Sequence, residues 1–224
     1  MSSYQEFADT AGIEAVRGFL HTPAISSGDG LILTHGAGAN CQAPLLVTLG
    51  DAFCASGWTV LRCDLPFRQA RRHGPPVRTA ERDQAGLRAA VNSMRRLIGA
   101  NAGTRIFLGG HSYGGRMASM LAAGNPGLVD ALLLLSYPLH PPKRPQQLRT
   151  QHFPALRTPA LFVSGARDGF GSLPEVETAR QLIPACTELV PITGAGHELL
   201  TKRNAEELPQ LVVERFLSFV GESS

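Results

Sequence analysis

Residues 105–120 read RIFLGGHSYGGRMASM, and this stretch predicts a buried strand, a sharp turn and a helix in direct succession. The short apolar run at residues 106–108 has the β-branched and aromatic content of a buried parallel strand. Nearly every residue from 116 to 123 is a good helix former. Between them, residues 110–114 (GHSYG) fit the G-x-S-x-G nucleophile elbow, whose glycines leave room for a sharp turn. The pattern predicts Ser112 as a nucleophile; the alternative is an ordinary serine in a glycine-rich turn.

The composition is that of a compact globular protein with many turns. The chain has 224 residues, of which 43% are hydrophobic, 17% are charged and 24 are glycine. This length suits one well-buried domain and is short for two, so we expect a single domain over residues 1–224. The formal net charge of +3 is too small to imply nucleic acid, and an aromatic content of 6% disfavours a platform for stacking bases. We therefore expect no nucleic-acid partner.

The sequence also predicts an intracellular protein. The first residues are polar, which argues against a signal peptide, and the longest apolar run, residues 131–135, is too short to span a bilayer. The cysteines show neither a C-x-x-C pair nor the histidine-rich spacing of a zinc site; they are Cys41, Cys54, Cys63 and Cys186. Free thiols fit a reducing compartment. We expect a cytoplasmic location, no membrane contact, no metal and no cofactor.

Strands and helices are predicted to alternate along the chain. A hairpin is expected over residues 7–20, and further strands at residues 31–34, 58–64, 106–108, 131–136, 160–165 and 187–192. Helices are expected at residues 44–56, 79–98, 116–123, 174–182 and 205–220, the last with Asn204 as its N-cap. Residues 68–78 and 139–157 are expected to form loops. The alternation predicts an α/β fold with a mostly parallel central sheet and helices on both faces.

Three polar residues are predicted at the carboxyl ends of strands, where ligands bind in an open α/β sheet: Ser112, Asp168 and His197. A serine nucleophile needs a base to take its proton, and the imidazole needs a carboxylate to fix its tautomer and stabilise its charge. The chain order nucleophile, acid, base is that of α/β-hydrolases. We predict these three residues as catalytic. Asp168 also fits a turn aspartate and His197 a loop histidine, and Asp64 is a second candidate for the acid.

Acyl transfer also needs hydrogen-bond donors for the oxyanion that develops during attack. The residue after the nucleophile usually gives one backbone N–H, which predicts Tyr113. The second donor is expected from the glycine-rich loop at residues 35–40, with Ala37 as the best candidate. His35 and His111 are expected to support the site, because neither is free to reach the serine as a base.

Several stretches match a known superfamily in order along the chain, at residues 33–39, 61–67, 109–118, 136–142 and 164–168. Together they resemble the α/β-hydrolases over nearly the whole sequence. More narrowly, they resemble the small, cap-less hydrolases akin to testis-expressed protein 30 and the hydrolase-like domain of the non-specific-lethal complex subunit 3, within a wider dienelactone-hydrolase-like group. The resemblance implies Ser112, Asp168 and His197 as a triad, with the amides of Ala37 and Tyr113 as the oxyanion hole. True dienelactone hydrolases have a cysteine nucleophile, so their substrate does not transfer to a chain with serine there.

Two basic loops are expected to flank a shallow site, because residues 138–158 leave room for a short loop and not for a large helical cap. The first contains Arg68, Arg71, Arg72, His73 and Arg78, and the second contains Lys143, Arg144 and Arg149. One interpretation is an electropositive rim that binds anionic substrates, with Arg68, Arg71 and Arg72 in contact with substrate. The other is a solvated surface with scattered ion pairs.

The sequence therefore favours a serine hydrolase that cleaves a small carboxylic ester or thioester through an acyl-enzyme on Ser112. The alternative from another class is a catalytically silent, hydrolase-like module that uses its basic surface to bind a protein or nucleic acid. A peptidase is a third possibility, although no cap or extra domain is predicted that would select peptides. The oligomeric state, monomer or homodimer, is left open.

Overall fold

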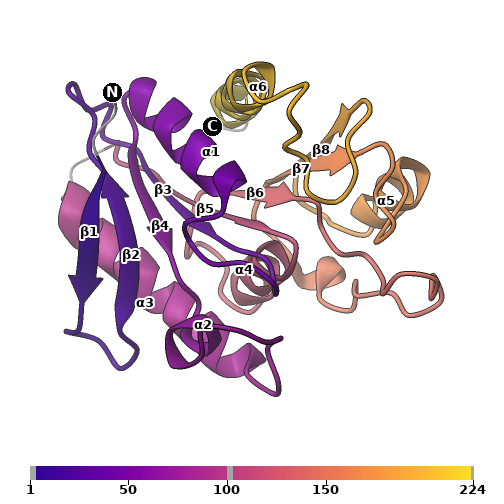
Figure 1. Cartoon of the computed structure of the whole chain (residues 1–224), viewed down its shortest axis with the longest axis horizontal. Helices are drawn as coiled ribbons and strands as arrows, with labels where there is room; N and C mark the ends of the chain where they lie inside the picture. Colours follow the sequence, from indigo (N-terminus) through magenta and orange to yellow (C-terminus); the bar gives the residue numbers. More distant parts are fainter. Residues whose placement is uncertain (1–3, 100–102, 223–224) are drawn as a thin grey trace.

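We describe the fold from a computed structural model that places residues 4–99 and 103–222. Its strands are β1 (Tyr4–Asp9), β2 (Val16–His21), β3 (Gly30–Thr34), β4 (Thr59–Cys63), β5 (Ile106–His111), β6 (Ala131–Leu135), β7 (Ala160–Gly165) and β8 (Thr187–Ile192). They form one sheet in the order β1-β2-β4-β3-β5-β6-β7-β8 (Figure 1). Strands β1 and β2 pair antiparallel at one edge, and every pairing from β4 to β8 is parallel. The prediction of a mostly parallel sheet is confirmed.

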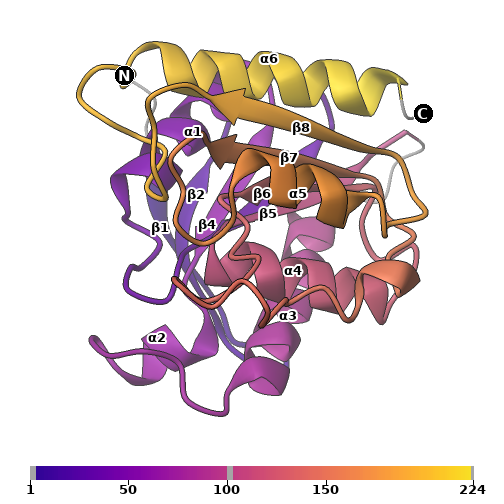
Figure 2. The same cartoon turned by 90° about the vertical axis from the view of Figure 1, so that its right-hand side faces the viewer.

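Helices cover both faces of this sheet, as Figure 2 shows. Helices α1 (Pro44–Ala55) and α6 (Glu207–Glu222) pack on one face, with a core that includes Trp58, Phe107 and Phe216. Helices α3 (Ala80–Ile98), α4 (Tyr113–Ala123) and α5 (Leu173–Arg180) pack on the other face. Every residue of β3 to β7 is buried, because a parallel strand in the middle of the sheet is covered on both sides.

Two local expectations from the sequence are wrong. Residues 66–70, which contain the start of an expected loop, form the short helix α2 (Pro66–Ala70), because a proline in the first turn already has the helical φ. Asn204 does not cap α6, which begins at Glu207. Its side-chain oxygen accepts hydrogen bonds from the backbone N–H and the hydroxyl of Thr201 instead, and its amide donates to the carbonyl of Leu199. Asn204 thus organises the loop before the helix.

The segment between β6 and β7 runs from the carboxyl end of β6 to the start of β7 and contains one turn of 3₁₀ helix, η1 (Phe153–Ala155). There is no large cap among residues 136–159, in agreement with the cap-less expectation. Over residues 4–99 and 103–222, no helix has both the length and the apolar character needed to cross a bilayer.

Candidate active site

Ser112 lies in a strained turn between β5 and α4. Its φ of 51° and ψ of −115° lie in a region that residues with a side chain rarely adopt. The surrounding backbones approach so closely that a Cβ on Gly110 would lie 2.5 Å from the Gly114 carbonyl carbon. A Cβ on Gly114 would lie 2.7 Å from the carbonyl oxygen of His35. Both glycines of the motif are therefore needed for the turn that presents Ser112 at the edge of the sheet.

A continuous chain of hydrogen bonds joins Ser112, His197 and Asp168, which lie far apart in the sequence. The hydroxyl of Ser112 lies 2.8 Å from Nε2 of His197. Nδ1 of the same imidazole lies 2.9 Å and 3.0 Å from the two carboxylate oxygens of Asp168. A carboxylate accepts only, so Nδ1 carries the proton and Nε2 is left to accept from the serine. The arrangement is that of a serine whose proton can pass to a neighbouring base.

Two further aromatic rings fix the position of His197. The ring of Phe170 stacks on the imidazole at a centroid distance of 4.1 Å, and its backbone N–H donates to Asp168. Nε2 of His111 donates to the carbonyl of His197 over 2.8 Å. Burial lowers the pKa of His111, which keeps its ring neutral. The expectation that His111 supports the site agrees with this contact, whereas the role of Phe170 left no signal in the sequence.

Ser112 lines a cavity of about 600 Å³. The glycine-rich loop at residues 36–39 lines it on one side, so Ala37 and Tyr113 both face the cavity that contains the serine. Tyr113 is the first residue of α4, where the helix itself offers no acceptor for the backbone N–H. The remaining lining residues include Pro75, Pro76, Arg116, Pro138, Arg149 and Glu198. Small residues on the loop and a free N–H at the helix start suit a site that binds a developing negative charge.

The side chain of Tyr113 is anchored below the cavity by a buried carboxylate. Its hydroxyl donates to Asp83 over 2.8 Å, and Asp83 is fully buried on α3. Asp83 also accepts from the backbone N–H of Phe67 and from the hydroxyl of Thr79. Burial and the neighbouring Asp83 raise the pKa of the Tyr113 phenol, so that it stays a donor at neutral pH. Asp83 is not among the site residues expected from the sequence. An acidic residue in the first turn of a helix is only a weak indication of such a role.

Arg68 lies inside the molecule, which corrects its expected place on a basic rim. Its side chain is buried, and its guanidinium donates to the carbonyls of Ala37 and Ala39 at 2.7 Å each. It also donates to the carbonyls of Arg72 and Gly74. All these acceptors belong to two loops, so Arg68 ties the 36–39 loop to the loop after α2. Its donors are occupied by the protein, and it does not face substrate.

Arg71 and Arg72 are exposed and are not among the residues that line the cavity beside Ser112. The loop after α2 contributes two prolines there, Pro75 and Pro76, in place of the expected cations. The first basic loop thus contacts the cavity through its two prolines, while its arginines point either into the fold or into solvent.

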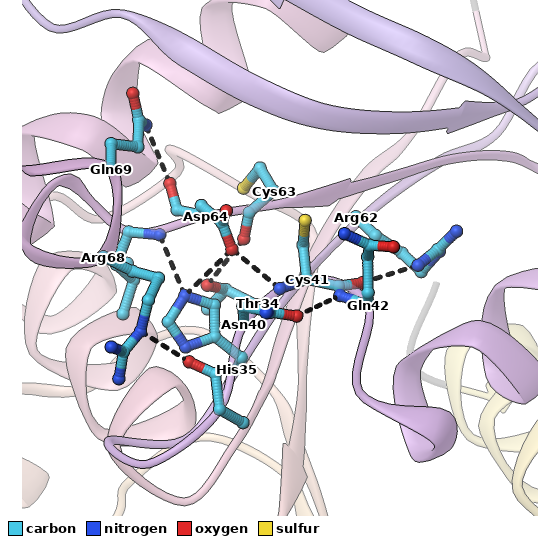
Figure 3. A network of polar contacts seen from close by, with 12 residues as sticks. Thr34, His35, Asn40, Cys41, Gln42, Arg62, Cys63, Asp64, Arg68 and Gln69 are labelled. Carbon is cyan, nitrogen blue, oxygen red and sulfur yellow. Dashed lines mark hydrogen bonds and ion pairs between the residues drawn. The ribbon is translucent and has the colours of Figure 1, made fainter. Parts of the chain in front are cut away.

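His35, which is buried, and Asp64, which is partly exposed, form a second cluster next to the loop, shown in Figure 3. Nε2 of His35 accepts from the backbone N–H of Leu65, and its Nδ1 donates to the carbonyl of Gly36. Burial lowers the pKa of His35, in agreement with a neutral ring in this place. Asp64 lies 3.4 Å from the same ring and accepts from the backbone N–H of Cys41 at 2.7 Å. The carboxylate that contacts His197 is Asp168. Asp64 instead contacts His35 and the backbone of Cys41, at the two ends of the glycine-rich loop.

A family model described as an alpha/beta hydrolase domain matches residues 28–221. The chain belongs to the α/β-hydrolase domain family. Three solved structures with this fold are a dienelactone hydrolase from Anabaena variabilis, the protein Est1E from Butyrivibrio proteoclasticus and a serine hydrolase without a lid from Xanthomonas campestris. The resemblance to α/β-hydrolases inferred from the sequence is confirmed.

These neighbours are distant in sequence but similar in fold. The dienelactone hydrolase is 23% identical with a TM-score of 0.71, and the match covers 96% of this chain and 98% of that one. Est1E is 17% identical with a TM-score of 0.74, covering 96% and 99%. The lid-less hydrolase is 16% identical with a TM-score of 0.72, covering 95% and 94%. Such identities establish the shared fold and leave the substrate to be argued from this chain's own residues.

Proposed function

We propose that this α/β-hydrolase is a serine hydrolase that cleaves a small carboxylic ester or thioester through an acyl-enzyme on Ser112. The observation that carries the proposal is the hydrogen-bond chain Ser112–His197–Asp168. Ser112 and His197 both line the cavity, where a substrate would bind. The fold shared with a dienelactone hydrolase and a serine hydrolase without a lid supports the reaction class. The cavity of about 600 Å³ and the lack of a large cap over residues 136–159 support a small substrate.

The proposed reaction begins when Oγ of Ser112 attacks the carbonyl carbon and its proton passes to Nε2 of His197. Asp168 holds Nδ1–H and stabilises the imidazolium that forms. The carbonyl oxygen becomes an oxyanion, which the backbone N–H groups of Ala37 and Tyr113 would receive. His197 then gives its proton to the leaving alcohol or thiol as the carbon–oxygen or carbon–sulfur bond breaks. His197 then takes a proton from water as the water oxygen attacks the acyl carbon. It returns that proton to Oγ of Ser112 as the bond between Oγ and the acyl carbon breaks, which releases the acid and free Ser112.

The test is labelling with a fluorophosphonate probe, followed by mass spectrometry of the modified peptide. We expect labelling at Ser112 that disappears in Ser112→Ala. Ser119→Ala is a matched control, because Ser119 also has an imidazole nitrogen 2.8 Å away, on His152, but is fully buried. That variant is expected to label like the wild type. Absence of labelling in folded wild-type protein would contradict the proposal and favour the alternative of a silent binding module.

We also propose one domain over residues 1–224 and a cytoplasmic location. Within the described residues all four cysteines are free, and three of them are buried, which supports a reducing compartment. No three His, Cys, Asp or Glu side chains of residues 4–99 and 103–222 gather in a way that could hold a metal ion. The proposed substrate is a small molecule. Size-exclusion chromatography with light scattering distinguishes a monomer from a homodimer.

A further inference from the structure

Two guanidinium groups reach the cavity beside Ser112 from different parts of the chain. Arg116 lies one turn into α4, and its backbone N–H donates to the carbonyl of Ser112 at 3.0 Å. Side chains four apart on a helix share a face and lean towards its N-terminus, so Arg116 is directed to the serine end of the helix. Arg149 comes from the segment between β6 and β7. Its backbone is fixed there by Leu139 and by the phenol of Tyr137, which donates to its carbonyl at 2.7 Å.

Neither guanidinium has a carboxylate partner among residues 4–99 and 103–222. Other arginines of this chain do, such as Arg180, which lies 2.6 Å from Glu177. Arg149 makes one long bond of 3.3 Å to the carbonyl of Pro138. Nε of Arg116 is buried and has no hydrogen-bond partner in the described structure. Among the described residues, the other N–H donors of the two guanidinium groups have no protein acceptor, and both residues line the cavity.

The two positive charges also act on each other. Burial, and then the charge of Arg116, lower the pKa of Arg149. The charge of Arg116 likewise contributes to lowering the pKa of His152 to about 4, after burial. Two like charges held together in a half-enclosed cavity are unfavourable without a counter-ion, so the site is prepared for an anion.

The acidic groups near the cavity do not neutralise this pair. Asp168 is occupied by His197. Glu198 is exposed and is the one acid among the described residues that line the cavity. It also lines a neighbouring cavity of about 270 Å³ with His35 and Leu46, which neither arginine reaches. The cavity thus has an acidic group on the His197 side and two free cations elsewhere on its wall.

We propose that Arg116 and Arg149 form an anion subsite that binds a carboxylate carried by the substrate, so that the preferred substrate is the half-ester or half-thioester of a small dicarboxylic acid. The inference rests on the proposed function of Ser112. A guanidinium presents two parallel N–H groups that match the two oxygens of a carboxylate. Arg149 belongs to the second basic loop that the sequence places beside the site, and it lines the cavity together with Arg116. The arginines expected to contact substrate from the first loop, Arg68, Arg71 and Arg72, do not line it.

The subsite is tested by comparing kcat/KM for monomethyl glutarate, which carries a carboxylate, with that for methyl pentanoate, a neutral ester of the same chain length. We expect the wild type to prefer the anionic ester. Arg116→Met and Arg149→Met remove each charge but keep an unbranched side chain, and each is expected to reduce the anionic-to-neutral ratio about ten- to hundredfold. Arg157→Ala is the control: this arginine is exposed on the same segment, outside the cavity, and the ratio should not change.

A binding measurement separates this inference from the proposed reaction. Ser112→Ala cannot form an acyl-enzyme, yet it keeps both arginines, so calorimetric titration with glutarate reports the subsite alone. Saturable binding that disappears when Arg116→Met and Arg149→Met are added supports the subsite even if neither ester is hydrolysed. Binding that survives both substitutions, or an unchanged ester ratio in both single variants, would overturn it. Binding of inorganic phosphate but not glutarate would overturn the assignment to a carboxylate.

Discussion

The phenol of Tyr113 donates a 2.8 Å hydrogen bond to Asp83, a carboxylate with no exposed surface. Tyr113 follows Ser112 directly, and its backbone N–H is the proposed donor to the oxyanion. The side chain of this residue is therefore tied to α3 while its main chain faces the cavity. We interpret Asp83 as a positioning residue that acts through Tyr113, since its contacts are with Tyr113, Thr79 and the backbone of Phe67.

Tyr113→Phe should lower kcat on a small neutral ester while KM stays nearly constant. The substitution removes the hydrogen bond to Asp83 and leaves the backbone N–H in place but less firmly held. We expect a loss of about 1–2 kcal/mol in the free energy of unfolding, measured in urea, because a buried acceptor loses one partner. Tyr4→Phe is the control, since Tyr4 is exposed on the edge strand β1. An unchanged kcat in Tyr113→Phe would argue against the positioning role.

Asp168→Asn should lower kcat about 10³- to 10⁴-fold, because an amide no longer fixes the tautomer of His197 or stabilises its charge. Asp64→Asn is the informative comparison, since Asp64 is the other candidate acid in the sequence and contacts His35 and Cys41 instead. We expect it to lower the stability and to affect kcat far less. Steady-state kinetics of both variants on one ester decide between the two acids. A greater loss of kcat in Asp64→Asn would reverse the assignment.

The sequence allows a prediction of those site residues that come soon after the carboxyl end of a predicted strand. Ser112, Asp168 and His197 each follow a predicted strand, and parallel strands end at one edge of a sheet, so their meeting needs no knowledge of packing. Arg116 could have been found in the same way, because it lies four residues after Ser112 on the predicted helix. Local sequence patterns are sufficient for such residues.

The parts that could not be predicted depend on contacts between distant segments. Arg68 lies in a basic, proline-bearing stretch that is typical of an exposed loop, yet the carbonyls of Ala37 and Ala39 surround its guanidinium. Phe170 lies in an irregular segment without periodicity, so nothing in the sequence indicates which way its side chain points. Arg149 is expected from the sequence in a basic loop that flanks the site, but the sequence does not distinguish it from Lys143 and Arg144, which are not among the residues that line the cavity. Only the folded chain brings them to the cavity beside Ser112.

Arg68→Ala should destabilise the protein and disorder the loop that lines the cavity. The change leaves the carbonyls of Ala37 and Ala39 without their donor, and we expect a loss of about 3 kcal/mol in the free energy of unfolding. Arg71→Ala removes an exposed arginine of the same loop and should change stability by less than about 0.5 kcal/mol. Urea denaturation of the two variants checks this. Equal stability of both would mean that Arg68 does not hold the loops together.

Acid should destabilise the fold before the carboxylates titrate, because His21 is held neutral. Burial, and then the charge of Arg62, lower the pKa of His21 to about 4. Arg62 donates to Nε2 of His21 at 2.7 Å, and Asp51 lies 3.1 Å from Nδ1 on the other side of the ring. The unfolded chain binds a proton at His21 near its ordinary pKa of 6.5, whereas the folded chain does not until about pH 4. Stability is therefore complete above pH 6.5 and falls as the pH drops from 6.5 towards 4.

The free energy of unfolding should fall by about 1.4 kcal/mol per pH unit for each histidine kept neutral in this window. His152, whose pKa burial also lowers to about 4, adds to the same slope. Urea denaturation at a series of pH values between about 7.5 and 5 measures it. His21→Gln removes one titrating group, so its unfolding free energy, lower at neutral pH, should depend less steeply on pH than that of the wild type. Parallel curves for the two proteins would show that His21 titrates alike in the folded and unfolded chains, and the buried contact with Arg62 would then not control its protonation.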